Sequence, residues 1–556
     1  GGQEPVAQGV DNLLLGQPEH RGLAGLTVPR ADEHLNEYIP ASSDRLRWLT
    51  GFTGSAGLAV VLAERAAMFT DGRYQLQVRA EVDAARFESR HSIEEPAEAW
   101  LAEVLRPGDR LGFDPWLHAE EGVAKLRRSV EAAGAALVPV EPNPVDEVWT
   151  DRPAPPSGQV APHPAVFSGE ESSAKRVRIG EAVAKAGASA AALTAPESIA
   201  WLLNIRGDDV PYNPVALAFA ILRADGQVSL FLDPARIDPG TRAHLGNGVA
   251  IEPRAALAPA LDRLGAAREA VLVDPRTAPA WFAERLRASG ARVLAEADPV
   301  ALPKATKNTV EQAGARAAHL RDAVAVCRFL AWLEREGPTG TLTELEAAER
   351  LLALRAEGDR FRGESFPAIT GSGPNGAIIH YRATAASDRR IVSGDVYLSD
   401  SGAQYLDGTT DVTRTVLIGD APADIAELRD RFTRVLKGHI AIATLRWPKG
   451  VAGPHIEAMA RRALWDVGLD YDHGTGHGIG SYLSVHEGPT GLSRAARPIA
   501  LAPGMILSNE PGFYAPGRWG IRLENLVLVV EAPFEGAAKP FLGFERLTLA
   551  PFDRRL

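Results

Sequence analysis

Two pairs of acidic residues are the part of this sequence with the clearest capacity for chemistry. Asp400 follows the apolar run before Ser399, and Asp411 stands eleven residues later, at the start of a valine- and threonine-rich run. Glu510 and Glu524 repeat this arrangement fourteen residues apart. Taken alone, the first pair also fits two turn aspartates. The repetition instead predicts two half-sites, each an apolar strand and a returning strand, that bring four carboxylates together around a pseudo-two-fold axis.

Four clustered carboxylates need a counter-charge. Each close pair costs roughly 4 kcal/mol at ~4 Å and an effective dielectric constant of about 20. Protonation or bound metal must therefore neutralise the cluster, and two divalent cations would balance four negative charges. Oxygen-rich ligation suits manganese, magnesium or calcium, and cobalt and zinc remain alternatives.

Histidines add to this constellation. His473 and His477 have the i, i+4 spacing of a helical zinc site, but four glycines in the eight residues 473–480 argue against a helix. We therefore expect one ligand, His477, with His473 in a supporting role. His380 and His486 are candidate proton carriers and oxyanion partners, because imidazole changes charge near neutral pH.

These side chains must be positioned by strands and turns. Asp407-Gly408 is a hairpin signal that would fold the strand after Asp400 back toward Asp411. Gly371–Gly376 fits a dinucleotide-binding glycine pattern literally, but a β-branched run follows it, so a strand-turn-strand corner is the better prediction. The expected strands are 377–381, 395–398, 412–417, 505–507 and 523–530. Helices are expected over 310–336, with Thr309 and Gln312 in a capping box, and over 344–356.

The first half of the chain reads as two versions of one α/β plan. Each version has a tryptophan, a glycine- or proline-rich loop and two apolar strands, 58–62 and 66–69 in the first, 215–222 and 228–232 in the second. A proline-rich linker, expected to hold neither a continuing helix nor a central strand, spans 141–164. The predicted domains are 1–150, 151–307 and 308–556.

Composition excludes several classes of protein. The 556 residues are 45% apolar and 24% charged, as in globular proteins, and the formal charge of -11 argues against a nucleic-acid partner. No stretch reaches the ~18 apolar residues of a membrane span, and residues 1–4 do not resemble a signal peptide, so a cytoplasmic protein is expected. Cys327, the single cysteine, is predicted to be a buried core thiol.

With these residues assembled, the chain resembles the aminopeptidase P family, the metal-dependent Xaa-Pro aminopeptidases of the creatinase and methionine aminopeptidase superfamily. It is similar to the long, three-domain cytosolic form. The resemblance implies two creatinase-like α/β domains followed by a catalytic domain with the pita-bread fold, in which an antiparallel sheet carries helices on its outer face. The motifs behind it are TGFTGSAG, FTDGRYQLQ, GSGPNGAIIHY, DSGAQYLDGTTDVTRT, LKGHIA, HGTGHGIG, VHEGP, NEPGFY and GIRLENLVLV.

The resemblance also implies how the site is built. It assigns five metal ligands, Asp400, Asp411, His477, Glu510 and Glu524, and two divalent ions, of which manganese is the usual choice, with cobalt and zinc as alternatives. Asp411 and Glu524 would bridge the ions, Asp400 would hold one, and His477 with Glu510 would hold the other.

The implied reaction is hydrolysis of the bond between a first residue and a following proline. A hydroxide bridging the two ions would attack the carbonyl carbon, with Glu510 as proton acceptor and His486 stabilising the oxyanion. Glu510 or a relay through His380 would protonate the proline nitrogen. His380, His477 and His486 would contact the substrate, and Arg73, from the N-terminal domain, would help to close the site; a surface salt bridge is the alternative for Arg73.

Two other functions are the alternatives to this one. A prolidase has the same ligands but requires a dipeptide, and a non-catalytic peptide-binding relative would have lost its metal site. A homodimer is possible by this resemblance, but the dimer contact is left open. The sequence ends at Leu556, before the further helical segment usual in long-form relatives.

Overall fold

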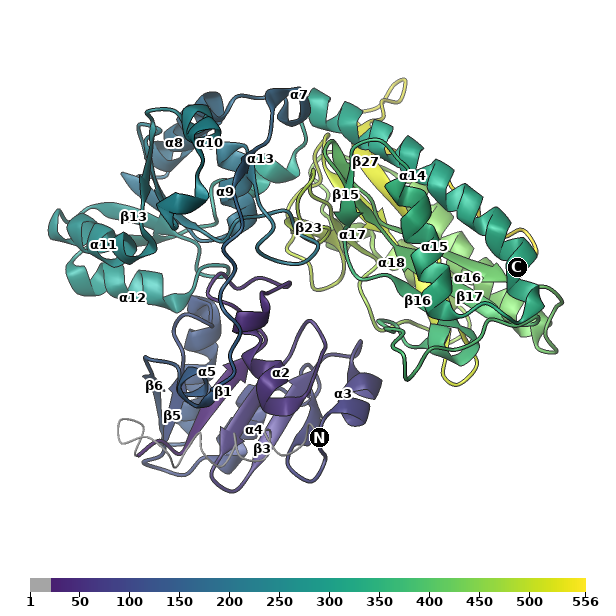
Figure 1. Ribbon diagram of the computed structural model, residues 1–556, viewed down its shortest axis with the longest axis horizontal. Helices are drawn as coiled ribbons and strands as arrows, with labels where there is room; N and C mark the ends of the chain where they lie inside the picture. Colours follow the sequence, from purple (N-terminus) through teal and green to yellow (C-terminus); the bar gives the residue numbers. More distant parts are fainter. Residues whose placement is uncertain (1–21) are drawn as a thin grey trace. The chain divides into compact units, whose positions relative to one another are not determined.

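The computed structural model describes residues 22–556 of the chain, so the expectation that no signal peptide is present lies outside the described residues. The chain forms two compact units (Figure 1). Unit 1 comprises residues up to Pro162, Glu170–Pro211 and Val215–Val300, and unit 2 comprises His163–Gly169, Tyr212–Pro214 and Ala301–Leu556.

Unit 1 contains two six-stranded sheets with the same topology. Their strand orders are β4-β3-β2-β1-β5-β6 and β12-β11-β10-β8-β13-β14. In each sheet, three adjacent strands pair with one another in antiparallel fashion, and every other strand is parallel to the neighbour nearer the centre. The strands are β1 Gly25–Pro29, β2 Leu58–Leu62, β3 Ala66–Thr70, β4 Glu88–His91, β5 Arg110–Phe113, β6 Ala136–Pro139, β8 Ala190–Leu193, β10 Phe219–Arg223, β11 Val228–Phe231, β12 Val249–Glu252, β13 Ala270–Val273 and β14 Arg292–Ala295. The expected repeat of one α/β plan is confirmed.

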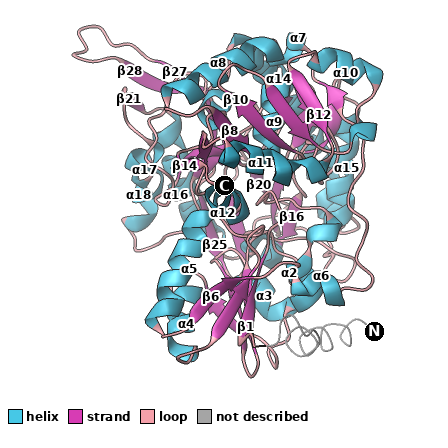
Figure 2. Ribbon diagram, turned by 90° about the vertical axis from the view of Figure 1, so that its left-hand side faces the viewer, coloured by secondary structure: helices cyan, strands magenta, loops and turns pink. Residues whose placement is uncertain are grey.

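Helices cover both faces of the first sheet (Figure 2), because its strands are apolar on both sides. Ala59 and Val61 of β2 pack toward α2 and α3, whereas Val60 packs toward α4 and α5. The helices of unit 1 are α2 Arg45–Thr50, α3 Gln75–Glu81, α4 Ala97–Val104, α5 Glu120–Ala132, α6 Pro144–Val148, α8 Ser172–Lys185, α9 Pro196–Leu203, α10 Pro239–Leu245, α11 Leu257–Ala266 and α12 Ala280–Ser289.

One expectation for this half needs correction, and another gains detail. The strand predicted over 215–222 begins only at Phe219, because the backbone before it turns around Asp209: the Leu217 N–H donates to Asp209 Oδ2 at 2.6 Å. The linker over 141–164, in which neither a continuing helix nor a central strand was expected, contains the short helix α6. Pro144 occupies its first turn, where a missing N–H is tolerated, and the Asn143 side chain accepts from the Val145 N–H.

Unit 2 is built from antiparallel strands and long helices. All its strand pairs are antiparallel. The strands are β15 Phe361–Glu364, β16 Ile369–Ser372, β17 Val396–Ser401, β18 Ala403–Tyr405, β19 Gly408–Thr409, β20 Val412–Leu417, β21 Arg446–Pro448, β22 Gly476–Gly478, β23 Glu487–Leu492, β24 Ile506–Asn509, β25 Gly512–Ala515, β26 Trp519–Arg522, β27 Asn525–Glu531 and β28 Phe541–Arg546. The helices are α7 Ala165–Ser168, α13 Ala301–Ala305, α14 Thr309–Glu336, α15 Glu344–Ala356, α16 Ile425–Ala443, α17 Gly453–Ile456 and α18 Ala458–Trp465.

The helices of unit 2 pack against its sheets through several hydrophobic cores, two of which adjoin the strands of the site. In one, Phe329 of α14 and Leu351 of α15 meet Tyr397 of β17. In the other, Phe432 of α16 contacts the cluster that contains Ile521 of β26. The fold class expected from the sequence, α/β domains followed by a pita-bread domain, is confirmed. The boundaries predicted near residues 150 and 307 stay predictions.

Local expectations in unit 2 have mixed outcomes. Helices α14 and α15 match the predicted ranges, but the capping box of α14 pairs Asn308 with Glu311, not Thr309 with Gln312. Cys327 is exposed and not buried, because Val326, Phe329 and Leu333 are the core-facing positions of α14 in this stretch.

The strand predicted over 377–381 is also wrong. Gly373–Ala377 form a 3-10 helix, η6, and a turn follows in which the Tyr381 N–H donates to the Ile378 carbonyl. The Tyr381 hydroxyl donates to Glu344 Oε2 at 2.8 Å, which fixes this turn against the start of α15. A strand-turn-strand corner is therefore not formed.

Within residues 22–556, no helix is both long enough and apolar enough to span a membrane.

Candidate metal centre

The first half-site is a hairpin. β17 and β20 pair so that Asp400 lies opposite Thr413, and Asp411 comes directly before β20. The chain between the two aspartates folds back through β18 and β19, in which Tyr405 pairs with Gly408. Asp400 and Asp411 are both buried. The hairpin predicted from Asp407-Gly408 is confirmed.

The second half-site repeats this plan. Glu510 directly follows β24, Glu524 directly precedes β27, and the hairpin of β25 and β26 connects them. The two half-sites meet where the Glu524 N–H donates to the Thr413 carbonyl at 3.2 Å. The Thr413 hydroxyl also donates to Glu524 Oε2 at 2.7 Å. Backbone and side chain thus fix the distance between the two halves.

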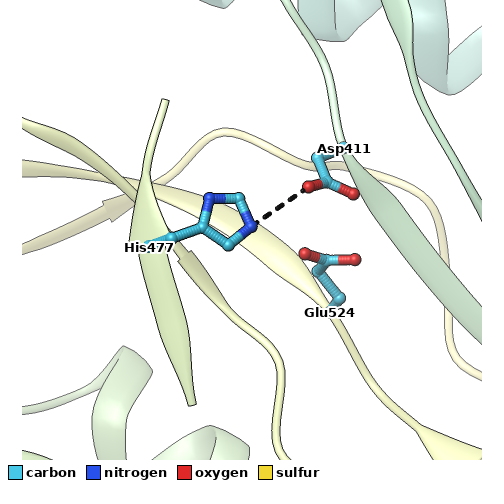
Figure 3. Close-up of side chains that lie close together, drawn as sticks. All are labelled: Asp411, His477 and Glu524. Atoms are coloured by element: carbon cyan, nitrogen blue, oxygen red, sulfur yellow. Dashed lines mark ion pairs between the residues drawn. The ribbon is translucent and has the colours of Figure 1, made fainter. Parts of the chain in front are cut away.

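His477 approaches the carboxylates from β22 (Figure 3). Its Nε2 lies 3.4 Å from Asp411 Oδ2 and 3.2 Å from Glu510 Oε1. Nδ1 contacts the Gly478 carbonyl at 2.9 Å, which leaves Nε2 as the atom that faces the carboxylates. A Cβ at Gly476 would lie 1.9 Å from the Ser508 carbonyl oxygen, so only glycine lets β22 run this close to β24. No helix forms here, as expected.

The geometry identifies one group of potential ligand atoms directly. Single ligand atoms from Asp411, His477 and Glu524 all lie within 4.8 Å of one another. Glu510 joins this group through His477. Asp400 joins it electrostatically, since Asp411 and Glu510 both raise its pKa.

The donor set fits divalent cations. Among the described residues, Asp400 Oδ1 and Glu524 Oε1 are buried and have no hydrogen-bond partner. A buried carboxylate oxygen without a partner is costly, and a bound cation removes that cost. Four carboxylates and one imidazole are ligands that manganese, cobalt and zinc all accept.

The pKa values of the cluster are strongly shifted. Burial, and secondarily the charges of Asp411 and Glu510, raise the pKa of Asp400 to about 7, although Arg522 opposes this shift. Burial and the neighbouring carboxylates raise the pKa of Glu524 well above its usual value. Burial would also raise the pKa of Glu510, but His477 outweighs this effect and lowers the value to about 2.

His477 shows the matching shift. Burial alone would lower its pKa, but hydrogen bonds and charges from Asp411 and Glu510 raise it well above its usual value. In the absence of metal, the cluster therefore holds protons to balance its charge.

Arg522 is a site residue that the sequence reasoning missed. Its Nη2 donates to Asp400 Oδ2 at 2.7 Å, and its Nη1 donates to the Tyr514 hydroxyl at 2.8 Å. The available signal was its position two residues before Glu524, because alternate residues of an extended chain share a face.

The remaining predicted residues have different surroundings. His473 Nε2 contacts the Tyr514 hydroxyl at 2.7 Å, the same hydroxyl that accepts from Arg522, and burial lowers the pKa of His473 to about 4. His486 is exposed, and its ring meets the His477 ring edge-on at 4.3 Å. His380 is half-buried in the turn after η6. Arg73, in unit 1, makes a two-bond ion pair with Asp71.

Comparison with known proteins now identifies the family. Residues 313–531 match metallopeptidase family M24, and residues 6–148 and 151–311 match the creatinase/prolidase N-terminal domain. A probable Xaa-Pro aminopeptidase P of Aspergillus niger is 41% identical over 548 residues, covering 95% of this chain and 88% of the relative. The chain belongs to the Xaa-Pro aminopeptidase P family. All five predicted ligands lie in the segment that matches family M24.

Other members of the Xaa-Pro aminopeptidase P family agree with this. Aminopeptidase P2 of Arabidopsis thaliana is 38% identical, covering 96% of this chain and 80% of the relative. The X-prolyl aminopeptidase of Caenorhabditis elegans, described as a cytosolic enzyme with a di-nuclear active site, has a TM-score of 0.93 and 34% identity, covering 100% of this chain and 92% of that chain. The Xaa-Pro dipeptidase of Bacillus anthracis, with 22% identity and a TM-score of 0.55 over 68% of this chain, shares the fold alone.

Proposed function

We propose that this protein is a dinuclear metal-dependent aminopeptidase that removes the first residue of peptides with proline at the second position. The observation that carries the proposal is the buried cluster around Asp411, His477 and Glu524, with unpaired oxygens on Asp400 and Glu524. Membership of the Xaa-Pro aminopeptidase P family supports the reaction and the substrate. The di-nuclear site described for the C. elegans relative supports two ions per chain.

Five side chains would hold the two ions, for which we propose manganese. Asp411 and Glu524 lie where the half-sites meet and would serve both ions. His477 and Glu510, 3.2 Å apart, would serve one, and Asp400 the other. When bound, such ions lower the pKa of a water molecule and polarise the substrate carbonyl.

The protein's own groups would move the protons. Glu510 accepts a proton from the attacking water; the Ser508 hydroxyl donates to Glu510 Oε1 at 2.9 Å and fixes the orientation of this carboxylate. His486, exposed beside His477, stabilises the negative charge that develops on the carbonyl oxygen. The proline nitrogen must gain a proton as its bond breaks, and Glu510 or a relay through His380 supplies it.

Binding and location complete the proposal. In this proposal the free amine of the substrate lies near Asp400. The proline is bordered by His380, His477 and His486, and Arg73 contacts the peptide. We propose a cytoplasmic location, as described for the C. elegans relative. The homodimer stays a prediction of the sequence.

Hydrolysis of Arg-Pro-Pro tests the function. Metal-stripped protein should release no arginine, addition of Mn²⁺ should restore release, and Glu510→Gln should lower kcat by about 10²–10⁴-fold. Glu545→Gln, which changes a surface carboxylate paired with Arg316, is the control and should keep full activity. Cleavage of Gly-Pro alone would instead identify a prolidase, and no turnover with any divalent metal would leave a peptide-binding protein.

A further inference from the structure

The hairpin between Asp400 and Asp411 contains a buried amide with an unusual set of partners. Gln404, on β18, is 3% exposed. Its Nε2 donates to the Leu483 carbonyl at 2.6 Å and to the Tyr212 carbonyl at 3.0 Å. Its Oε1 accepts from the Thr409 hydroxyl at 2.7 Å. One side chain thus joins the hairpin to two segments that are remote in sequence.

The first of these segments is the loop 479–486, which links the His477 strand to His486. Both backbone groups of Leu483 are hydrogen-bonded to the hairpin. Its carbonyl accepts from Gln404, and its N–H donates to Thr409 Oγ1 at 3.4 Å. The Gly480 N–H donates to the Ser484 carbonyl at 2.9 Å, and the Ser484 hydroxyl donates to the His486 carbonyl at 3.0 Å. These hydrogen bonds therefore connect the backbone of Leu483 to the backbone of His486.

The second segment is Tyr212–Pro214. It belongs to unit 2, although the chain on either side of it belongs to unit 1. Tyr212 has a φ of +66°, a strained value for a tyrosine. The Gln404 hydrogen bond to its carbonyl helps to hold it in that conformation.

Both groups that face Gln404 Nε2 are carbonyl oxygens, so the site requires a donor there. An amide of this length supplies two N–H bonds and one acceptor, which match the two carbonyls and the Thr409 hydroxyl. A carboxylate of the same shape would place negative charge against both carbonyls. Replacement of the amide is thus a sharp test of what it does.

We propose that Gln404 is a positioning residue that sets the location of His486 relative to the Asp400 and Asp411 hairpin, through the loop 479–486. The inference rests on the proposed function only for the catalytic role of His486. In this scheme, Gln404 touches neither metal nor substrate, and it acts through the backbone of Leu483.

Gln404→Glu in the full chain, loaded with Mn²⁺, tests the inference. Deuterium uptake by the peptide that covers residues 479–486 should increase, and kcat for Arg-Pro-Pro should fall by about tenfold or more. Asn308→Asp is the matched control, since the Asn308 amide also donates to a backbone carbonyl, that of Ser168, at 2.8 Å. It makes the same chemical change without a bond to the loop, so uptake over 479–486 and kcat should stay at wild-type values.

A double-mutant cycle separates positioning from general destabilisation. His486→Ala combined with Gln404→Glu should be no slower than His486→Ala alone, because both act on one group. The inference would be overturned if the losses in kcat of the two single variants multiplied in the double variant. Unchanged deuterium uptake over 479–486 in Gln404→Glu would also overturn it. Wild-type kcat in His486→Ala would instead refute the proposed catalytic role of His486, while the uptake measurement would still decide whether Gln404 holds the loop.

Discussion

Asp400 and Glu524 are carboxylates that are only half satisfied by protein groups. One oxygen of each accepts hydrogen bonds, from Arg522 and Thr413 respectively, and the other has no partner among the described residues. Burial raises the pKa of both groups. Metal binding and protonation therefore compete for the same oxygens, and the metal-free protein should reveal this through its pH dependence.

For the metal-free protein, we expect the free energy of unfolding to fall as the pH rises from about 5 to about 7. In this range Asp400, with a pKa of about 7, still holds its proton when folded, whereas it is ionised when unfolded. The folded state thus binds more protons, and stability decreases with pH by at most about 1.4 kcal/mol per pH unit for one such group. Urea unfolding at pH 5, 6 and 7 measures the slope.

His477, whose pKa is also raised, contributes a slope of the same sign, whereas Glu510, with a pKa of about 2, acts only at lower pH. Asp400→Asn should make the slope shallower. A metal-free protein that becomes more stable between pH 5 and 7 would contradict the assignment of these protonated groups.

At this scale, the sequence contained the identities of the acidic residues and of His477, because their spacing around apolar runs is visible in one dimension. It did not reveal Arg522 as the partner of Asp400. That contact joins residues 122 positions apart and depends on how the hairpin of β25 and β26 meets β17.

At the scale of secondary-structure elements, Arg414 links β20 to the second half-site and to the C-terminal segment. Its Nη1 donates to the carbonyls of Thr413 and Glu524, and its Nη2 donates to Asn525 and Ala550. Its Nε donates to the Pro551 carbonyl at 2.9 Å. Burial lowers the pKa of Arg414 to about 9, so burying this guanidinium costs free energy. Its five hydrogen bonds, which hold the two half-sites together, offset that cost.

Arg414→Lys should weaken both the fold and the metal site. Lysine has three donors and cannot reproduce five hydrogen bonds in a planar fork, so we expect a loss of about 1–3 kcal/mol of stability. Because the carbonyl of Glu524 is one of the lost partners, Mn²⁺ affinity should fall about tenfold. Thermal unfolding and metal titration measure the two effects.

Arg335→Lys is the control for this substitution, since within residues 22–556 Arg335 donates only to the Ala331 carbonyl, on the exposed side of α14. It should change neither quantity. A drop in stability with unchanged Mn²⁺ affinity in Arg414→Lys would show that Arg414 supports the fold alone.

Elements with a periodic pattern were predictable, and elements fixed by side-chain hydrogen bonds were not. The apolar repeats of α14 and α15 and the hairpin signal at Asp407-Gly408 led to the observed structures. The run 377–381 has the composition of a strand, yet Glu344 accepts from Tyr381 and from the Ser372 N–H and bends it into a turn. No local pattern encodes a partner that lies 37 residues earlier, as Glu344 does for Tyr381.

At the scale of the whole molecule, Arg73 is the residue outside the family M24 segment that we propose as a peptide contact. Arg73→Ala should raise KM for Arg-Pro-Pro by about tenfold, the size expected from losing one hydrogen bond to a charged group, with little change in kcat or metal content. Steady-state kinetics on the Mn²⁺-loaded protein measures both constants. Arg65→Ala, which breaks an exposed ion pair with Glu88 in the same unit, should leave KM unchanged. Equal KM values in the two variants would mean that Arg73 serves only its ion pair with Asp71.

Because the two sheets of unit 1 share one topology, equivalent positions in them can be compared. An arginine follows the third strand in each: Arg73 after β3 and Arg236 after β11. Arg73 remains 28% exposed, whereas Arg236 is 8% exposed and forms a 2.6 Å ion pair with the fully buried Asp209. The two equivalent arginines therefore differ in what they can do: Arg236 is committed to an internal ion pair, whereas the Arg73 side chain keeps a solvent-accessible edge on which a ligand can bind.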